Sequence, residues 1–545
     1  MNICWFADFN RTKRTVLFLK TERKECVMRG NNRFCVFLNI VDMHVYSENN
    51  GARAGETLMR NMRSLVKTFF PDAQLSCENG GSFCLITRDE AVEEKIGKVA
   101  KGVRLLGGIT PVLIKAGIYE VPPDADPPIS ELLAYAQTAE SFIHDEDGVL
   151  FRYYDDTLRR MLANREYVRK HLSAAIEGGE IKVFYQPIIR TLSGRIVGFE
   201  ALTRWEDPIL GFLSPKEFIS AIEESRQINI LDSFMIKQIC KDLREGIDAG
   251  IPIRSVSFNL SRLDFHLSDV FAFVENAVKE YRIDRSYLNI EITEKILSES
   301  EQIRMQIRRF TDAGYKVWMD DFGRGYASLN TLKEYDFDKL KIDMNSAAFG
   351  SERSKEIITA TVVATKRMGI RTLAEGVETE EQLDFLRSIG CEEVQGYYFS
   401  KPLPIGEIEA TLNPKGIVME ETEDAALFDE AGREDISDDR ARAILLFCGE
   451  RFEPLLINRS CELLCAEVLG TDKSLSDVMN DPSSAFFRLI CDRMNACAVR
   501  GKEDCFVLHG PNRAFVLRLK IIASNADKTI LKIEAEKADL VEMIS

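Results

Sequence analysis

Short runs of apolar residues alternate with amphipathic stretches between about residues 180 and 405. Most of the intervening stretches repeat their apolar residues at helical spacing, which predicts strands that alternate with helices. Eight such strands indicate an α/β fold of the (β/α)8 barrel type. The eight runs cover residues 183–189, 196–199, 256–258, 288–290, 317–319, 340–342, 371–373 and 393–394.

The connection between the first two runs departs from a regular barrel. Only residues 190–195 separate these runs, with Ser193 and Gly194 at the centre. A parallel crossover needs a dozen or more residues, whereas two antiparallel strands can be joined by a short turn. We therefore expect a modified TIM-like barrel whose first strand is antiparallel.

Regions with other patterns flank this barrel, which we place at residues 161–414. A charged helix over 155–176 is expected to join it to an N-terminal α/β domain at residues 1–160. Residues 441–545 predict an α+β domain with two strands, helical segments and then three strands. The N-terminal elements are strands at 34–39, 112–121 and 149–154, a hairpin over 74–86 and helices over 53–70 and 91–105.

An acidic segment separates the barrel from the C-terminal domain. Ten acidic residues and one base, Arg433, lie between Glu420 and Asp439, so this stretch carries −9 of the formal net charge of −16. So few apolar groups cannot offset the entropy lost on ordering such a stretch. We therefore expect residues 415–440 to be a linker.

Composition excludes several functions. The chain has 71 Lys and Arg against 87 Asp and Glu, so we expect no nucleic acid polymer as a partner. No run of about 18 apolar residues occurs, which predicts a cytoplasmic protein without a membrane partner. The 13 cysteines form no CxxC pair and are expected to be reduced thiols. Six of them lie beyond residue 440, where redox sensing is the alternative.

Polar residues follow the apolar runs at one level of the predicted barrel. The C-terminal ends of barrel strands converge on one face, so these side chains are expected to meet. That much negative charge requires cations, and oxygen ligands without His or Cys favour Mg2+ or Mn2+. Any one of these carboxylates alone is more often a helix cap or an ion-pair partner. The residues are Glu200, Asn259, Glu291, Asp320, Asp321, Lys341, Glu375 and Gln395.

The adjacent Asp320 and Asp321 allow one carboxylate to bridge two ions while the other binds only the second. This is the arrangement of two-metal phosphodiester cleavage, in which the ions activate water and stabilise the leaving oxygen. The amine of Lys341 is suited to orienting that water or to stabilising the developing charge.

Five short motifs follow one another along this region. They are Glu200-Ala201-Leu202-Thr203-Arg204, Asp320-Asp321-Phe322-Gly323-Arg324-Gly325-Tyr326, Lys341-Ile342-Asp343, Ala374-Glu375-Gly376-Val377-Glu378 and Gln395-Gly396-Tyr397. The series resembles the EAL family of cyclic di-GMP phosphodiesterases over about residues 181–412. The resemblance implies hydrolysis of one phosphodiester of cyclic di-GMP, which yields the linear dinucleotide pGpG.

The same resemblance implies a role for each polar residue. Lys341 would position the attacking water, and Gln395 would steady the water network. Glu375 would act in the shell of the second ion. The implied metal ligands are Glu200, Asn259, Glu291 and Asp320 for one ion and Asp320 with Asp321 for the second. The implied substrate contacts are Gln186, Leu202, Arg204 and Glu378, of which Arg204 is a planar donor suited to phosphate.

A loop after the two aspartates carries the implied regulation. Glu294 matches the glutamate that holds loop 321–329 in this family, and that loop couples dimer contacts to metal binding, which implies a homodimer. Arg324 stands where a threonine is common, and we expect it to alter the loop rather than the chemistry.

Two alternatives to this enzyme remain. One is a cyclic di-GMP receptor that binds without turnover and signals through its flanking domains. The other is a barrel phosphodiesterase for a different nucleotide. The filled metal positions favour the enzyme over the receptor, and Gln186 with Arg204 favours cyclic di-GMP over another nucleotide.

The flanking domains carry weaker resemblances. The stretch from Phe37 to Glu56 and the hairpin at 79–83 resemble a GGDEF diguanylate cyclase domain. Asn39 replaces its first-strand metal aspartate, and Gly81 with Ser82 replaces its acidic pair. This implies a degenerate GGDEF-like domain without cyclase activity, either a scaffold or a weakened nucleotide sensor. The element order of residues 441–545 is similar to a PAS sensor domain.

Overall fold

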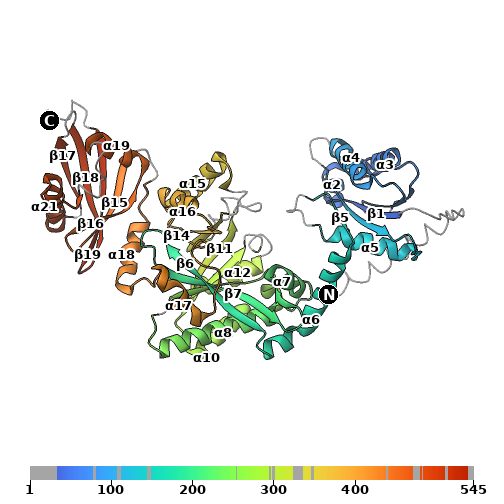
Figure 1. Ribbon diagram of the computed structural model, residues 1–545, viewed down its shortest axis with the longest axis horizontal. Coiled ribbons are helices and arrows are strands. Elements are labelled where there is room, and N and C mark those ends of the chain that lie inside the picture. The colour runs from blue at the N-terminus through green and yellow to red at the C-terminus, as the bar shows by residue number, and fades with distance from the viewer. Residues whose placement is uncertain are drawn as a thin grey trace. The chain divides into compact units, whose positions relative to one another are not determined.

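The computed structural model divides the chain into two compact units, Met1–Tyr167 and Val168–Ser545 (Figure 1). Helix α6 (Asp156–Glu177) spans the boundary between them, as predicted for residues 155–176. The described residues are 33–77, 81–106, 112–143, 149–252, 254–293, 296, 301–322, 335–344, 349–436, 440–469, 479–481, 483–501, 503–509 and 514–537.

The first unit is a five-stranded sheet in the order β2-β3-β1-β4-β5. Its central strand buries both faces, because Val36 and Leu38 pack under helices α3 and α4 while Cys35 and Phe37 pack under α5. The predicted elements are all present, and a short helix, α2 (Met43–Asn50), was not predicted. The bounds are β1 Arg33–Ile40, α3 Ala52–Phe69, β2 Gln74–Cys77, β3 Ser82–Thr87, α4 Val92–Leu106, β4 Ile114–Val121, α5 Ile129–Ser141 and β5 Phe151–Tyr153.

The second unit begins with a closed barrel. Its sheet runs β6-β14-β13-β12-β11-β10-β9-β7-β8, and a further pairing of β6 with β7 closes it. Strand β6 is antiparallel to both neighbours, whereas the strands from β7 through β9 to β14 are parallel, so the modified barrel is confirmed. The bounds are β6 Ile181–Arg190, β7 Ile196–Asp207, β8 Gly211–Leu213, β9 Ser255–Asn259, β10 Leu288–Thr293, β11 Lys316–Phe322, β12 Lys339–Asp343, β13 Arg371–Glu375 and β14 Glu393–Val394.

Helices surround this barrel and cover its outer apolar face. Alternate strand residues such as Leu288, Ile290 and Ile292 point outward into the main hydrophobic core, which the helices complete. The helices are α7 Pro215–Glu224, α8 Ile228–Asp248, α9 Arg262–Leu267, α10 Val270–Tyr281, α12 Glu301–Asp312, α15 Glu352–Arg367, α16 Glu380–Ser388 and α17 Ile408–Leu412.

The barrel interior is layered. The remaining alternate positions point inward, and in the middle Ile188, Trp318 and Leu373 form a small apolar cluster. Polar residues occupy the strands on either side of this cluster. The apolar layer therefore separates a polar C-terminal end of the barrel from a polar N-terminal end.

A second sheet forms the C-terminal part of this unit, in the order β16-β15-β19-β18-β17 with all neighbours antiparallel. Helices α19 (Arg459–Leu469) and α21 (Ala485–Arg500) pack on one face of the sheet, and α18 (Thr422–Gly432) packs on the other. The strands follow the predicted pattern closely. They are β15 Ala441–Cys448, β16 Arg451–Ile457, β17 Glu503–His509, β18 Ala514–Ser524 and β19 Lys528–Lys537.

The acidic segment is not the linker that its composition predicted. Helix α18 buries Leu427, Phe428 and Ala431 against the C-terminal sheet. Acids on this helix and just after it are paired with bases from distant parts of the chain: Asp429 pairs with Arg190 at 2.8 Å, and Glu434 accepts from Lys520 at 3.0 Å and from Lys532 at 2.7 Å. Local composition counts the acids but not these partners, so the prediction of a linker was wrong for the described residues 415–436.

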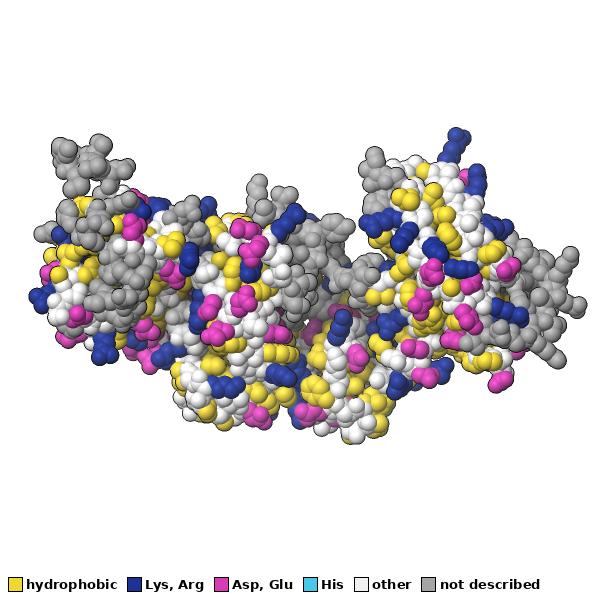
Figure 2. Space-filling view, turned by 45° about the horizontal axis from the view of Figure 1, so that its top comes forward, with side chains coloured by type: hydrophobic (Ala, Val, Ile, Leu, Met, Phe, Trp, Pro, Cys, Tyr) yellow, Lys and Arg dark blue, Asp and Glu magenta, His cyan; other side chains and the backbone are white. Residues whose placement is uncertain are grey.

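Two surface properties bear on partners. Within the described residues, none of the helices combines the length and apolar character needed to cross a bilayer. On the face in Figure 2, basic and acidic side chains are interspersed over the second unit.

Candidate active site at the C-terminal ends of the barrel strands

One buried lysine holds four carboxylates together. The Nζ atom of Lys341 on β12 lies 2.7 Å from Glu291, 3.3 Å from Asp320 and from Glu375, and 3.4 Å from Glu200. These acids come from four other strands. The lysine is 1% exposed and Glu291 is 0% exposed, whereas Asp320 and Glu375 are partly exposed. The cluster is therefore fully buried at Lys341 and Glu291 and becomes more exposed at Asp320 and Glu375.

Strand register explains why residues so distant in sequence meet. Asn259 pairs with Glu291 across β9 and β10, and Gln186 pairs with Glu200 across β6 and β7. Parallel strands with matched register place their C-terminal inward residues at one height. The sequence prediction that these polar side chains converge is thus met by the geometry.

Side-chain amides hold Glu200 in place. Asn259 donates from Nδ2 to Glu200 Oε1 at 3.0 Å, and Gln395 donates from Nε2 to Glu200 Oε2 at 2.7 Å. Gln395 also reaches Gln186 Oε1 at 3.0 Å, and Gln186 donates to the carbonyl of Ser400 at 3.1 Å. Both oxygens of this carboxylate are therefore fixed before any ligand arrives.

The two aspartates lie in an irregularity of β11. The register with β12 shifts between Met319 and Phe322, and Asp321 adopts a left-handed φ of 57°. Its backbone N–H donates to Asp320 Oδ1 at 2.9 Å. A bulge of this kind redirects side chains near active sites, so consecutive aspartates need not point to opposite faces of the sheet.

Burial and crowding of charge set the protonation of the cluster. Burial alone would lower the pKa of Lys341, but Glu200, Glu291 and the other acids raise it well above its usual range. Burial raises the pKa of Glu291 to about 8, and the charge of Glu200 adds to this. Burial likewise raises the pKa of Glu375 to about 7, against the opposing effect of Lys341. Four carboxylates exceed what one ammonium can neutralise.

The predicted substrate positions lie near this cluster with different exposure. Arg204 is half-buried, and burial lowers its pKa while nearby Tyr397 and Glu200 partly offset that effect. Leu202 is half-buried opposite Phe184, and Glu378 is exposed after β13. Glu294 and residues 323–329 of the predicted loop lie outside the described residues.

Sequence analysis gave no role to Tyr397, which is 57% exposed beside Arg204. The signal was present, because Tyr397 belongs to a motif already singled out. The glycine of that motif has a steric reason: a Cβ at Gly396 would lie 2.0 Å from the carbonyl oxygen of Val377. The loops after β13 and β14 can therefore approach closely enough for Val377 N–H to donate to the Gln395 carbonyl at 3.0 Å.

The donor set fits hard divalent cations. Glu291 Oε1 and Gln395 Oε1 are buried and have no hydrogen bond from any described residue. Carboxylate and amide oxygens of this kind are ligands for Mg2+ or Mn2+. No three Asp, Glu, His or Cys side chains in the described ranges already form a metal cage, since Lys341 lies among the acids.

Comparison with known proteins assigns the barrel region to a family. Residues 169–402 match the family model described as EAL domain. The chain therefore contains an EAL domain. Relatives of this domain include cyclic di-GMP phosphodiesterases, among them NbdA of Pseudomonas aeruginosa, which is 28% identical over 417 residues, 74% of this chain and 53% of that protein.

Two further relatives show the range of the family. The oxygen sensor protein DosP of Escherichia coli is 30% identical over 368 residues, 66% of this chain and 46% of that one. The Vibrio cholerae LapD S helix-GGDEF-EAL structure, bound to c-di-GMP, shares the fold with a TM-score of 0.52 at 18% identity, over 72% of this chain and 93% of that one. The chain spans about half the length of the curated relatives it matches.

Proposed function

We propose that the protein hydrolyses cyclic di-GMP to pGpG in a reaction that depends on Mg2+ or Mn2+. The observation that carries this proposal is the convergence of Glu200, Glu291, Asp320 and Glu375 on one lysine. Such an excess of buried carboxylate is costly unless cations neutralise it. The EAL domain and its phosphodiesterase relatives supply the substrate class.

The ligands would divide as the motifs imply. Glu200, Asn259, Glu291 and Asp320 would hold one ion, and Asp320 with Asp321 would hold the second, with Glu375 in its shell. Bound divalent cations would lower the pKa of a coordinated water and stabilise the leaving oxygen. The amides of Asn259 and Gln395 already orient Glu200 for this task.

The protein's own groups would bind and orient the substrate. Lys341 stays protonated at neutral pH because the acids raise its pKa, so it can donate to an attacking water or a phosphate oxygen. Arg204 offers a planar fork to phosphate, and Tyr397 beside it offers a ring to a guanine base. Gln186, Leu202 and Glu378 would complete the substrate contacts.

We further propose that the flanking domains regulate rather than catalyse. In the N-terminal domain, Ser82 donates to Asn39 at 3.3 Å and Asn39 donates to Glu140 at 3.0 Å. Asn39 and Ser82 are uncharged and hydrogen-bonded to one another where a cyclase would hold metal, which supports a degenerate GGDEF-like domain. The strand order of the C-terminal sheet supports a PAS-like sensor. A cytoplasmic homodimer remains the expected state.

Incubation of the full-length protein with cyclic di-GMP tests the proposal. Chromatography should show pGpG in Mg2+ or Mn2+ and none in EDTA. Tight binding of cyclic di-GMP without turnover in either metal would instead make the protein a receptor. If the protein neither binds nor hydrolyses cyclic di-GMP, the substrate assignment is contradicted.

A further inference from the structure

A polar cavity lies at the N-terminal end of the barrel, opposite the candidate active site. Its volume is about 540 Å3, which is within the range of small-molecule sites. Inward residues of β10 to β14 line it, among them Asn289, Trp318, Lys339 and Arg371. Helix α18 contributes a wall through Thr422, Ala425 and Asp429. The apolar layer of Ile188, Trp318 and Leu373 separates this cavity from the active site.

Two buried polar groups that line the cavity lack partners. Asn289 is 1% exposed, and neither its Nδ2 nor its Oδ1 forms a hydrogen bond with a described residue. Trp318 is 3% exposed, and its Nε1 likewise has none. A buried donor or acceptor left unsatisfied costs about 1–3 kcal/mol. A ligand in the cavity would therefore meet one acceptor, the Asn289 Oδ1 atom, and two donors, the Asn289 amide nitrogen and the Trp318 indole N–H.

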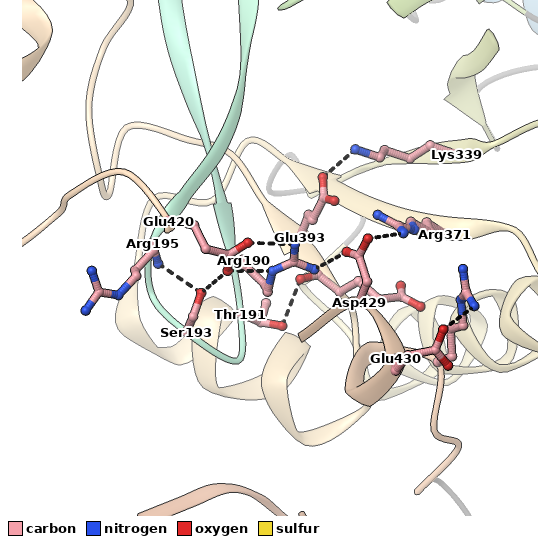
Figure 3. A network of polar contacts seen from close by, with 12 residues as sticks. Arg190, Thr191, Ser193, Arg195, Lys339, Arg371, Glu393, Glu420, Asp429 and Glu430 are labelled. Atoms are coloured by element: carbon pink, nitrogen blue, oxygen red, sulfur yellow. Dashed lines mark hydrogen bonds and ion pairs between the residues drawn. The ribbon is translucent and has the colours of Figure 1, made fainter. Parts of the chain in front are cut away.

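Most charges around the cavity are already neutralised by one another (Figure 3). Arg190 makes a bidentate pair with Glu420 at 2.8 and 2.9 Å and a third bond to Asp429, which also accepts from Arg371. Lys339 pairs with Glu393. The deep wall is thus close to neutral and rigidly held.

The rim of the cavity carries two bases, Lys316 and Arg254, and its lining also includes Asp336 and Asp338. Lys316 pairs in register with Asn289 across β10 and β11, and its exposed side chain makes no ion pair with any described residue. Arg254, half-buried at the start of β9, lines the same cavity. A ligand seated on Asn289 would therefore reach a positive charge at the mouth.

We propose that this cavity binds a mononucleotide. An Asn amide offers a donor and an acceptor side by side, which matches the edge of a nucleobase, and the indole N–H adds a second donor. Lys316 and Arg254 would meet the phosphate. The Trp318 ring would not stack on the base, because Lys339 Nζ already lies 3.7 Å from its centroid. The site is independent of the proposed phosphodiesterase activity.

Titration of the full-length protein with AMP, GMP, ATP, GTP and inorganic phosphate tests this site. Calorimetry should show at least one nucleotide bound with a Kd below about 1 mM. Trp318→Phe and Asn289→Leu should each weaken it by about tenfold or more, the cost of one buried hydrogen bond. Trp318 is one of three tryptophans, so binding should also change the intrinsic fluorescence of the wild type and not that of Trp318→Phe.

Trp205→Phe is the matched control, because Trp205 is buried elsewhere and its indole N–H donates to Glu180 at 3.4 Å. Its nucleotide affinity should equal that of the wild type. Failure of every nucleotide to bind would overturn the proposal. So would equal affinity in all three variants, or phosphate alone binding as tightly as the nucleotides. If Asn289→Leu does not fold, Trp318→Phe decides the matter.

Discussion

The two ends of the barrel are built from the same strands but hold charge differently. Lys341 and Lys339 lie two residues apart on β12 and point inward at opposite ends. Lys341 faces four carboxylates, whereas Lys339 faces one, Glu393, and the ring of Trp318. The C-terminal end thus carries an excess of negative charge, and the N-terminal end is nearly balanced.

This difference separates the roles of the two ends. Under the proposed function, the unbalanced carboxylates would raise the free energy of the metal-free protein and lower it again when cations bind, so they would serve chemistry. Balanced pairs serve stability, which matches the general division between the two faces of a TIM barrel. If the comparison holds, substitutions at the N-terminal end should change the free energy of unfolding, and those at the C-terminal end should change turnover.

The largest effect on stability is expected from Glu393→Gln. It leaves the ammonium of Lys339 buried without its carboxylate, and breaking such a pair costs about 3–5 kcal/mol. Urea unfolding measures the loss. The double variant with Lys339→Met should recover most of it and keep turnover within about threefold. A loss below about 1 kcal/mol would show that the pair is not what holds this end together.

The largest effect on turnover is expected from Glu200→Ala. Its carboxylate accepts from Asn259 and Gln395 and would bind metal, so pGpG formation should fall at least about 10²-fold. The Glu393→Gln/Lys339→Met double variant is the control for a charge change inside the barrel. Near-normal activity of Glu200→Ala would remove the metal assignment from this residue.

Much of the barrel and of its C-terminal polar cluster could be predicted from the sequence. The eight strands follow from the apolar runs, and the antiparallel first strand follows from the short connection at residues 190–195. The convergence of Glu200, Glu291, Asp320 and Glu375 follows from the polar residues at the ends of the runs. Such patterns succeed because strand alternation and barrel topology are local or general rules. The polar cluster at the C-terminal end of the barrel could be predicted because most of its residues directly follow an apolar run.

The N-terminal end was missed for the converse reason. Asn289, Lys339 and Arg371 stand at the beginnings of their strands, where a polar residue looks like the end of a loop. The order of α18 was missed because its acids find bases far away in sequence, such as Asp429 with Arg190. Partners of high sequence separation leave no trace in local composition.

Helix α18 gives a smaller test of the balanced end. Asp429→Asn removes the carboxylate shared by Arg190 and Arg371 and should cost about 1.5–3 kcal/mol, the range for hydrogen bonds to charged groups. The neighbouring Glu430→Gln is the control, because among the described residues Glu430 pairs only with exposed Arg433, and it should cost under about 0.5 kcal/mol. Equal losses in urea unfolding would mean that α18 is not held through Asp429.

The remaining effect concerns pH at the unbalanced end. The pKa of Glu291 is raised to about 8 and that of Glu375 to about 7, both from 4.5, so the folded metal-free protein binds more protons than the unfolded chain above pH 4.5. These groups therefore stabilise it less as pH rises towards 8. Since metal binding must release their protons, Mn2+ affinity should rise about tenfold per pH unit for each proton released, and level off above pH 8.

Calorimetric titration of Mn2+ into the full-length protein at pH 6, 7 and 8 measures this rise. Glu291→Gln is the informative variant, because it removes the group with the higher pKa and should flatten the curve between pH 7 and 8. The same affinity at pH 6 and pH 8 in the wild type would mean that both carboxyls are already ionised. Their burial and crowding around Lys341 would then not raise their pKa, and all four carboxylates would already be charged in the metal-free protein.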